Sequence, residues 1–529
     1  VEYKVTALDE YAFNYSEELI SVTIPNTVTY IGNNAFYFCR KLTSVTIPNS
    51  VVTIDSYAFS ICSSLQSLTI PNSVTTIGAW AFESCKQLTS VIIPNSVTSL
   101  GNHAFTNCTG LTSVTISNTV TILNRTFVDC TGLTSVTIPN SVTSMNGTFS
   151  GCTGLSSVVI PNSVTSMDGT FEGCTKLTSI TIPNSVTSIQ MAFKDCTGLT
   201  SVSIPNSVTN INNAFRGCTE LTNVTIPNSV TSMTYAFCDC AKLTNVTIPN
   251  SVTSIDGTFY GCTSLTSIEI PNNVTSIDRT FYGCTSLTSI EIPNSVTSID
   301  RTFYGCISLT SVVIPKSVTV IGSYTFYDCS QLASIEIPDS VSSIGQGAFH
   351  NCKNLPELII PDRVATIGES AFSSTSCTVY YGGNATGSPW GAKRLIRGSV
   401  IDGDFVYADK QKTKLVAYLG SDSVITIPDN VKTIAEKAFY NSTGLTSVVI
   451  PESVTSIEKQ AFYYCTGLKS IVIPDSISTI GYEAFYSVKR IYYGGAATRS
   501  PWGAHFYVRG SVIDGDFVYA DKQKTKLVA

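Results

Sequence analysis

LQSLTIPNSVTTIGAWAFESCKQ, the stretch from Leu65 to Gln87, is one copy of a sequence that recurs along almost the whole chain. Each copy closes on a Cys, and successive closing Cys residues are first 23, then 22, then again 23 positions apart. A fixed period in this range is typical of a solenoid, in which each repeat is one coil that buries its apolar side chains only against neighbouring coils. We therefore expect an extended β-rich solenoid instead of a globular enzyme core. The closing residues are Cys39, Cys62, Cys85, Cys108, Cys130, Cys152, Cys174, Cys196, Cys218, Cys240, Cys262, Cys284, Cys306, Cys329 and Cys352.

Each coil is predicted to contain a strand, a corner and a turn-rich return. In Leu42–Ile47 (LTSVTI) apolar residues alternate with Ser and Thr, which is the pattern of a half-buried strand. Pro48 ends this strand because it has no amide hydrogen for a ladder. The return contains a second short apolar pattern (SVTTIG) and then AFESC, where Phe82 and Cys85 lie three apart and predict a single helical turn.

The change from 23 to 22 residues has a definite place within the coil. Leu100 and Phe105 are five positions apart, whereas the equivalent Met145 and Phe149 are four apart. The missing residue is therefore predicted to lie on the side of the coil opposite the strand.

Charge and hydropathy exclude two classes of partner. Charged residues make up only 13% of the 529 residues, the net charge is −6, and Lys and Arg are scattered. A protein that neutralises phosphates needs a basic stripe, so we expect no nucleic-acid partner. Ser, Thr, Asn and Pro interrupt every apolar run well before the roughly 20 residues that span a bilayer, so we also expect no membrane insertion.

Two segments depart from the repeat and divide the chain. YYGGNATGSPWGAKRLIRGSVIDGDFVYADKQKTKLVAY starts at Tyr380, and a near copy starts at Tyr492. Short apolar runs on either side of the polar turn DKQKT predict a β-hairpin in each copy. The predicted organisation is a solenoid block over 1–377, a joint with a hairpin over 378–420, a second block over 421–490 and a second, truncated joint over 491–529.

The joints contain two tryptophans, Trp390 and Trp502, in Gly-rich loops. Aromatic residues next to Gly often form binding surfaces, so both are candidate ligand-binding residues. The alternative is that these loops pack over the open end of a block of coils.

The pattern LxxVxIPxxVxxIxxxAFxxC resembles the BspA-like class of leucine-rich repeats over nearly the whole chain. The resemblance implies a right-handed leucine-rich-repeat solenoid, here of about 20 coils, with the LTSVTI strands on its concave face. It also implies an extracellular protein on a cell surface. Known members include adhesins for host matrix and plasma proteins and for the surface molecules of other cells.

The Cys column is predicted to be structural. Stacked coils would bring consecutive Cys within disulfide range, but the equivalent position is Ser16 in the first coil and Val488 near the end. Buried free thiols are therefore expected, with Cys238, which lies outside the column, the most exposed. The three histidines are far apart, and no phosphate loop or metal-ligand spacing is present. We expect no catalytic residue, no metal site, no cofactor and no enzymatic activity.

Ligand choice is expected to depend on outward strand positions, because the consensus residues are the buried ones. Rows of Ser and Thr could also suit ice binding, but several residues interrupt the Thr row, and three of the interruptions are candidate ligand contacts: Glu269, Glu291 and Glu336. The predicted function is a non-catalytic cell-surface binding or adhesion scaffold that recognises host or microbial macromolecules through the concave strand face. The alternative is a structural surface filament or array in which the chain stacks end to end with itself.

Overall fold

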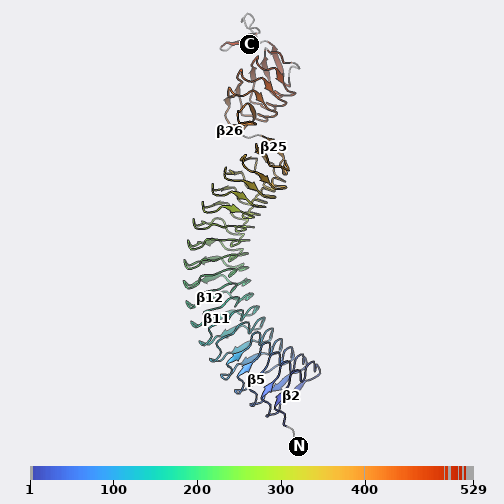
Figure 1. Ribbon diagram of the computed structural model, residues 1–529, viewed down its shortest axis with the longest axis vertical. Helices are drawn as coiled ribbons and strands as arrows, with labels where there is room; N and C mark the ends of the chain where they lie inside the picture. Colours follow the sequence, from blue (N-terminus) through green and yellow to red (C-terminus); the bar gives the residue numbers. More distant parts are fainter. Residues whose placement is uncertain are drawn as a thin grey trace. The chain divides into compact units, whose positions relative to one another are not determined.

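The computed structural model describes residues 4–397, 400–493, 495–497, 502–509, 512–514 and 517–519. Over these residues the chain is a parallel β-solenoid without a helix, drawn in Figure 1, and successive coils stack in sequence order within each of two units. The chain divides into two compact units. Unit 1 contains Val1–Leu355 and Ile367–Ser376, and unit 2 contains Pro356–Thr366 and Cys377–Ala529, so the first joint belongs with the second block.

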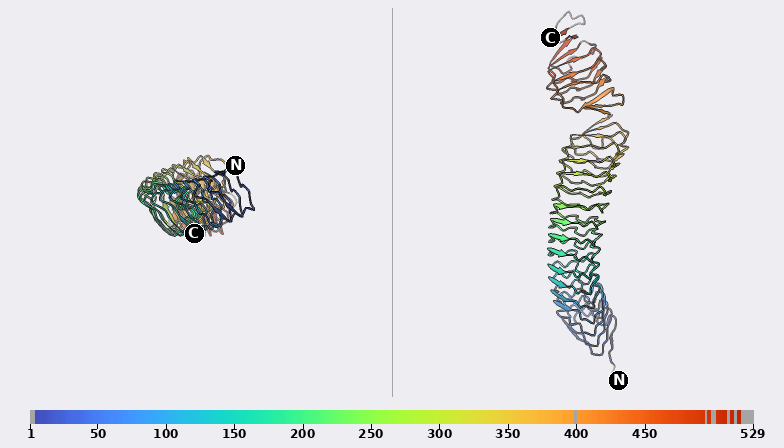
Figure 2. Two further views of the ribbon diagram at one scale, coloured as in Figure 1. Left: turned by 90° about the horizontal axis from the view of Figure 1, so that it is seen from below. Right: turned by 90° about the vertical axis from the view of Figure 1, so that its left-hand side faces the viewer.

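The strands of unit 1 that were predicted from LTSVTI form parallel ladders, here called the first-arc strands. Their central residue is mostly buried and its neighbours are exposed, as the alternation predicts; Val45, for example, is 8% exposed. Successive strands pair in register, so that Ser135 lies opposite Ser157. The right-hand view of Figure 2 shows the strands of the green coils on one side of unit 1 and the turns on the other. The first-arc strands of this unit are β2 (Ser21–Thr23), β4 (Ser44–Thr46), β7 (Ser90–Ile92), β9 (Ser113–Thr115), β10 (Ser135–Thr137), β11 (Ser157–Val159), β12 (Ser179–Thr181), β13 (Ser201–Ser203), β14 (Asn223–Thr225), β15 (Asn245–Val246), β16 (Ser289–Glu291), β18 (Ser311–Val313) and β20 (Ser334–Ile335).

A second set of short strands lies on the return and occurs mainly in the 23-residue coils. In most of the 22-residue coils it is reduced to isolated bridges, such as those that join Ser144, Ser166 and Ser188. The missing residue therefore lies opposite the first-arc strands, as predicted. The second-arc strands are β1 (Ala7–Leu8), β3 (Tyr30–Ile31), β5 (Thr53–Ile54), β6 (Thr76–Ile77) and β8 (Ser99–Leu100), then β17 (Ser298–Ile299), β19 (Val320–Ile321), β21 (Ser343–Ile344) and β23 (Thr366–Ile367).

The helical turn predicted for AFESC is wrong. The backbone amides of Trp80, Phe82 and Ser84 donate to carbonyls of the next coil at 2.8–3.1 Å, so they are not available for a helical hydrogen bond within the coil. Trp80 and Ser84 have φ of +55° and +58°, and the segment is a series of turns.

One continuous apolar core runs through the coils of unit 1, as the repeat predicts. The Phe column from Phe13 to Phe372 stacks ring on ring, with centroids 4.9–6.0 Å apart. The inward Val, Leu, Phe and Cys side chains on either side of it, such as Val74, Leu88 and Cys85, are fully buried. Stability is thus shared between neighbouring coils.

Unit 2 contains a three-stranded parallel sheet, a hairpin and a stack of coils. β22 (Glu357–Ile360), β24 (Thr378–Tyr381) and β25 (Arg394–Arg397) are parallel. The hairpin predicted around DKQKT is confirmed, since β26 (Val400–Asp402), β27 (Phe405–Tyr407) and β28 (Lys414–Tyr418) pair antiparallel. β28 also pairs in parallel with β30 (Thr433–Ile434), so the hairpin begins the second-arc ladder of this stack.

The remaining strands of unit 2 repeat the arrangement of unit 1. The second-arc ladder continues from β30 through β32 to β34, and part of the second joint forms the antiparallel pair β37 and β38. The last strand expected in that joint lies outside the described residues. These strands are β29 (Val424–Thr426), β31 (Ser447–Val449), β32 (Ser456–Ile457), β33 (Ser470–Ile473), β34 (Thr479–Ile480), β35 (Arg490–Tyr493), β36 (Phe506–Arg509), β37 (Val512–Asp514) and β38 (Phe517–Tyr519).

Candidate binding surface

The outward residues of the first-arc strands, together with the equivalent residues of coils in which this strand is short or absent, form one surface of unit 1, here called the strand face. Its Ser and Thr side chains are exposed in regular rows. Apolar residues interrupt these rows and are exposed to an unusual degree for their type, with Ile92 at 65%, Val159 at 80% and Val313 at 70%. The strand face therefore differs from coil to coil while the core beneath it repeats.

The three candidate glutamates all lie on this strand face and are exposed. Glu269 and Glu291 occupy equivalent positions in neighbouring coils, and Val313, which pairs in register with Glu291, separates that residue from Glu336. Within the part of the chain that the structure describes, none of the three carboxylates forms an ion pair. Their negative charge is thus available to a cationic partner.

A shallow hollow lies beside Glu269, where the first-arc ladder is interrupted. β15 is only two residues long, and Ser267–Glu269 forms no strand. The hollow has a volume of about 280 Å³. It is lined by Asn228, Val246, Thr247, Ile248, Pro249, Asn250, Glu269 and Pro271. Apolar, amide and carboxylate groups therefore meet at this point of the strand face.

The two tryptophans do not contribute to a surface. Trp390 is 3% exposed, packs edge-on against Tyr381 at 5.6 Å and donates a hydrogen bond from Nε1 to the Thr386 carbonyl at 2.7 Å. Trp502 is 4% exposed and packs in the same way against Tyr493, also at 5.6 Å. Each indole is buried inside its own joint, so a ligand at the surface would not touch it.

A second hollow, of about 430 Å³, lies on the turn side where the coils change from 23 to 22 residues. It exists because Gly147 and Gly169 carry no side chains there. Its two carboxylates already have partners: Asp168 accepts from Ser188 Oγ at 2.7 Å, and Glu172 is 2.6 Å from Lys194. This hollow is explained by the packing of the coils.

The Cys residues form no disulfide among the described residues, as predicted, and all are buried. Those of the column donate from Sγ to the Phe carbonyl of the preceding coil, as Cys108 does to Phe82 at 3.2 Å. Burial raises the pKa of the Cys108 thiol to about 12, which keeps it protonated and unreactive. Cys238 is the most exposed of the Cys residues, as predicted, but at only 3% it is still buried, and its thiol lies beside Asp239.

The three histidines lie apart from one another. His103 stacks on Trp80 at 4.9 Å and His350 on Tyr327 at 4.6 Å, while His505 lies in unit 2. No group of three or more His, Cys, Asp or Glu in this part of the chain could hold a metal ion. None of the described residues forms an apolar helix long enough to cross a bilayer.

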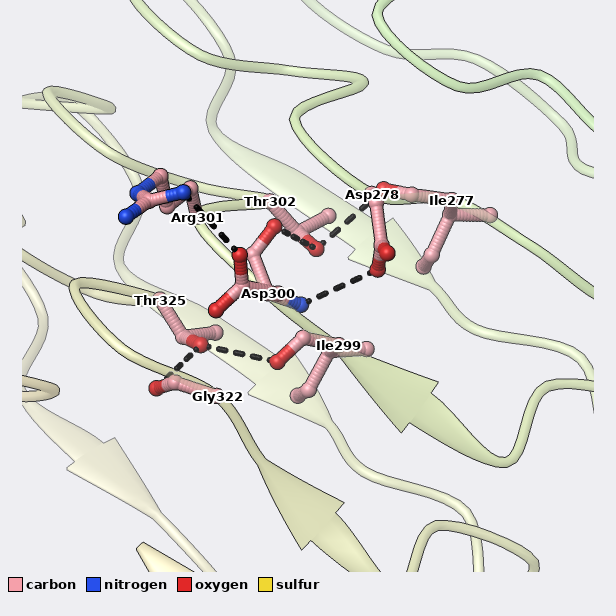
Figure 3. A network of polar contacts seen from close by, with 8 residues as sticks. All are labelled: Ile277, Asp278, Ile299, Asp300, Arg301, Thr302, Gly322 and Thr325. Carbon is pink, nitrogen blue, oxygen red and sulfur yellow. Dashed lines mark hydrogen bonds and ion pairs between the residues drawn. The ribbon is translucent and has the colours of Figure 1, made fainter. Parts of the chain in front are cut away.

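The recurring Asp and Arg residues of the turn side are used within the solenoid. Figure 3 shows Asp300 with its amide donating to Asp278 Oδ1 at 3.3 Å and its own carboxylate 3.5 Å from Arg301 Nη1. Beside them the Thr302 hydroxyl donates to the Ile277 carbonyl at 3.2 Å. These polar groups link neighbouring coils.

A family model described as the BspA type leucine rich repeat region, in six copies, matches residues 6–133, 120–233, 190–302, 278–381 and 418–493, which is most of the chain. The chain belongs to this BspA-type leucine-rich repeat family. None of the curated proteins matches it.

Several solved structures of bacterial leucine-rich repeat proteins are similar to this BspA-type chain. A leucine-rich repeat protein from Bacteroides ovatus is 30% identical, with 69% of this chain and 86% of that chain covered and a TM-score of 0.49. A leucine rich cell surface protein from Faecalibacterium prausnitzii is 31% identical, with 63% and 83% covered and a TM-score of 0.38. A leucine rich repeat protein of T. pallidum is 32% identical, with 33% and 72% covered and a TM-score of 0.26.

Sequence reasoning missed one surface feature of this BspA-type solenoid, a stack of rings on the turn side of unit 1. Tyr260, Tyr282, Tyr304, Tyr327 and His350 stack face to face with centroids 4.2–4.6 Å apart, and we call them the ring ladder. The signal in the sequence is an aromatic residue directly after the core Phe, as in the repeated TFYGC. Because every inner ring is covered on both faces, the ladder offers mainly ring edges and hydroxyls.

Proposed function

We propose that this chain is a non-catalytic recognition scaffold at a cell surface, which binds host or microbial macromolecules through its strand face. The observation that carries the proposal is the contrast between a repeated, buried core and an exposed strand face that varies from coil to coil. Solenoids commonly use such extended faces for binding. A cell-surface location would match the description of the Faecalibacterium prausnitzii protein.

The contact is proposed to centre on Glu269 and Glu291. Both carboxylates are exposed, neither has an ion-pair partner within the described residues, and Glu269 borders the 280 Å³ hollow. Like charges at equivalent positions of neighbouring coils repel each other without a partner, and complementary charge speeds association. The proposed partner is therefore a macromolecule with a basic patch, such as a matrix or plasma protein.

Capture of immobilised matrix and plasma proteins by the full chain tests the proposal. The variants Glu269→Lys and Glu291→Lys are expected to slow association about tenfold and to remove its salt dependence. The matched control is Glu452→Lys, an exposed carboxylate in unit 2, which should change neither. Equal binding by all three variants would contradict the assignment to the strand face.

The structural alternative predicts a different behaviour of the pure protein. An end-to-end assembly would give filaments whose length grows with concentration in electron micrographs. We expect a monodisperse particle at all concentrations; filaments without capture of any partner would favour the structural role.

A further inference from the structure

Unit 2 carries a cluster of exposed tyrosines on its turn side. Four of them are exposed well beyond what is usual for Tyr: Tyr440 by 44%, Tyr464 by 43%, Tyr482 by 71% and Tyr486 by 39%. Tyr440, Tyr464 and Tyr486 contact Tyr463, and Tyr482 lies in the same coil as Tyr486, next to Glu483; we call these five residues the tyrosine patch. Exposed aromatic clusters on a soluble surface commonly mark binding sites.

The rings of the patch are arranged differently from those of the ring ladder. Tyr440, Tyr463 and Tyr486 stack, with centroids 5.5 and 4.7 Å apart. Tyr464 lies beside this stack, 4.8 Å from Tyr463 and 5.6 Å from Tyr486, at 81° and 72° to their planes. Its ring therefore stands across the stack, and the residue remains 43% exposed.

Hydrogen-bonding groups adjoin these rings. Gln460 Nε2 donates to Glu483 Oε2 at 2.9 Å, which orients both side chains and leaves oxygens of each free to accept. The carboxylate of Glu483 raises the pKa of Tyr482, chiefly through a hydrogen bond from its hydroxyl. The Lys437 ammonium lies 5.9 Å from the centroid of the Tyr440 ring.

This combination favours a particular ligand chemistry. A pyranose has a flat C–H face that packs on an aromatic ring and equatorial hydroxyls that pair with amide and carboxylate oxygens. A protein interface of standard size would need an apolar centre, but the exposed aliphatic residues of coils 421–490, Val424 and Val449, lie on the first-arc strands instead.

We propose that the tyrosine patch of unit 2 is a carbohydrate-binding site that takes neutral oligosaccharides, with Tyr464 and Tyr482 stacking on sugar rings and Gln460 and Glu483 accepting sugar hydroxyls. This site is separate from the strand face, so it adds a glycan-binding function to the proposed macromolecular recognition.

Unit 1 contains the internal control. The rings of the ring ladder stack at 4.2–4.6 Å, and among the described residues a steeply inclined ring, that of Tyr324 at 66°, lies beside Tyr327 but none lies beside Tyr282 or Tyr304, which are the control positions. Two tyrosine arrays in one protein thus differ in whether a ring face is open, and only the tyrosine patch should bind.

Titration calorimetry of the full chain with maltohexaose, laminarihexaose, chitohexaose and a galactan hexamer tests the proposal, with hyaluronan as an acidic comparison. At least one neutral sugar should bind. Tyr464→Ser and Tyr482→Ser should each weaken it at least about tenfold, whereas Tyr464→Phe, which keeps the ring, should bind within about threefold of the parent. Tyr282→Ser in the ring ladder should not change affinity.

The outcomes separate this site from the strand face. Glu269→Lys should retain sugar binding, so that loss of protein capture and loss of sugar binding are independent. If a Ser variant fails to fold by circular dichroism, Glu483→Gln provides a second test and should also weaken binding. The proposal would be overturned if no neutral sugar bound, if only hyaluronan bound, or if Tyr464→Ser and Glu483→Gln left the affinity unchanged. A protein partner that the patch holds and that these sugars do not displace would also overturn it.

Discussion

The 23-residue and 22-residue coils of unit 1 differ in the hydrogen bonds of the return, the part of the coil opposite the first-arc strand. In the longer coils the amide that follows the second-arc strand bonds to backbone, as Gly101 N does to the Ile77 carbonyl at 2.8 Å. In shorter coils a side chain takes over this role: Asn146 Oδ1 accepts both Asp168 N, at 2.9 Å, and Ser166 Oγ, at 2.7 Å. Figure 3 shows the last of these contacts, in which the Asp300 amide still donates to the Asp278 carboxylate. In the next coil the Gly322 amide again donates to a backbone carbonyl, that of Ile299, at 2.6 Å.

This difference shows that one residue of backbone can be removed when a side-chain oxygen replaces the lost carbonyl. It also explains why the repeated Asn and Asp of the turn side are poor candidates for ligand sites. Their oxygens satisfy buried or half-buried donors that would otherwise lack partners, which would cost about 1–3 kcal/mol each. Ligand binding is therefore expected on surfaces whose side chains do not accept hydrogen bonds of this kind.

The largest expected loss of stability concerns the Phe column, which runs through both kinds of coil. Phe82→Ala in a 23-residue coil and Phe171→Ala in a 22-residue coil should each lower the free energy of unfolding by about 3–5 kcal/mol, because both rings stack on two neighbours and leave a cavity. Denaturation in urea, followed by circular dichroism, measures this loss. A much smaller loss in one kind of coil would show that the core is not continuous.

A smaller loss of stability is expected when a Thr that directly precedes the core Phe of a 22-residue coil is replaced. The fully buried Thr170 hydroxyl bonds to the carbonyls of Met145 and Met167, both at 2.7 Å. Thr170→Val should destabilise the protein by about 1–3 kcal/mol. Thr126, whose buried hydroxyl has no hydrogen-bond partner within the described residues, is the control, and Thr126→Val should be neutral or stabilising. Equal costs in a urea titration would contradict this account.

Several Asn and Asp side chains of the turn side, here called the side-chain ladder, accept a hydrogen bond from the backbone amide of the next coil. Each such side chain should contribute about 1 kcal/mol to stability. Asn146→Ala removes an oxygen that accepts two hydrogen bonds. Gln190 occupies the equivalent place two coils later and makes no side-chain hydrogen bond within the described residues, so Gln190→Ala should have little effect. A thermal-unfolding comparison in which both variants lose the same stability would show that the ladder is not needed.

The smallest effect on stability concerns the negative charge of an Asp in the side-chain ladder. Burial, and then the neighbouring Asp256 carboxylate, raise the pKa of Asp278. A carboxyl with a raised pKa destabilises the fold at pH values above its folded pKa, and this penalty disappears as pH falls below its unfolded pKa. Asp278→Asn, which copies the residue used at Asn146, should therefore add about 0.5 kcal/mol at pH 7 and nothing near pH 3. A stability gain that does not depend on pH would argue against the charge explanation.

The sequence could predict everything that follows from the repeat of apolar residues. Pro48 marks the end of a first-arc strand, Phe82 and Cys85 point inward, and the four-residue spacing of Met145 and Phe149 places the deletion opposite the strands. These predictions succeed because each coil packs against coils of nearly the same sequence. An apolar residue at a given position of the repeat is therefore buried in every copy.

Predictions failed where neighbouring coils compete with local structure. The AFESC segment has helical spacing, but amides such as Phe82 N bond to the next coil instead. Trp390 lies in a Gly-rich loop for which binding and packing were both open, and the structure buries it inside its joint. Tyr464 carries no special sequence signal, because its exposed face depends on the perpendicular packing of three rings from two coils. The glutamates of the strand face, Glu269 among them, lie at the surface as expected, and their ligand remains a proposal.

Hydrogen exchange at the Asp168 amide tests the central claim most directly, because this amide is held by a side chain in place of a backbone strand. In the Asn146→Ala variant the amide should exchange roughly tenfold faster, while the Gly101 amide, which is bonded to backbone in a 23-residue coil, should keep its rate. An unchanged Asp168 rate, or equal acceleration at both amides, would contradict the claim that side-chain oxygens replace the missing backbone in the short coils.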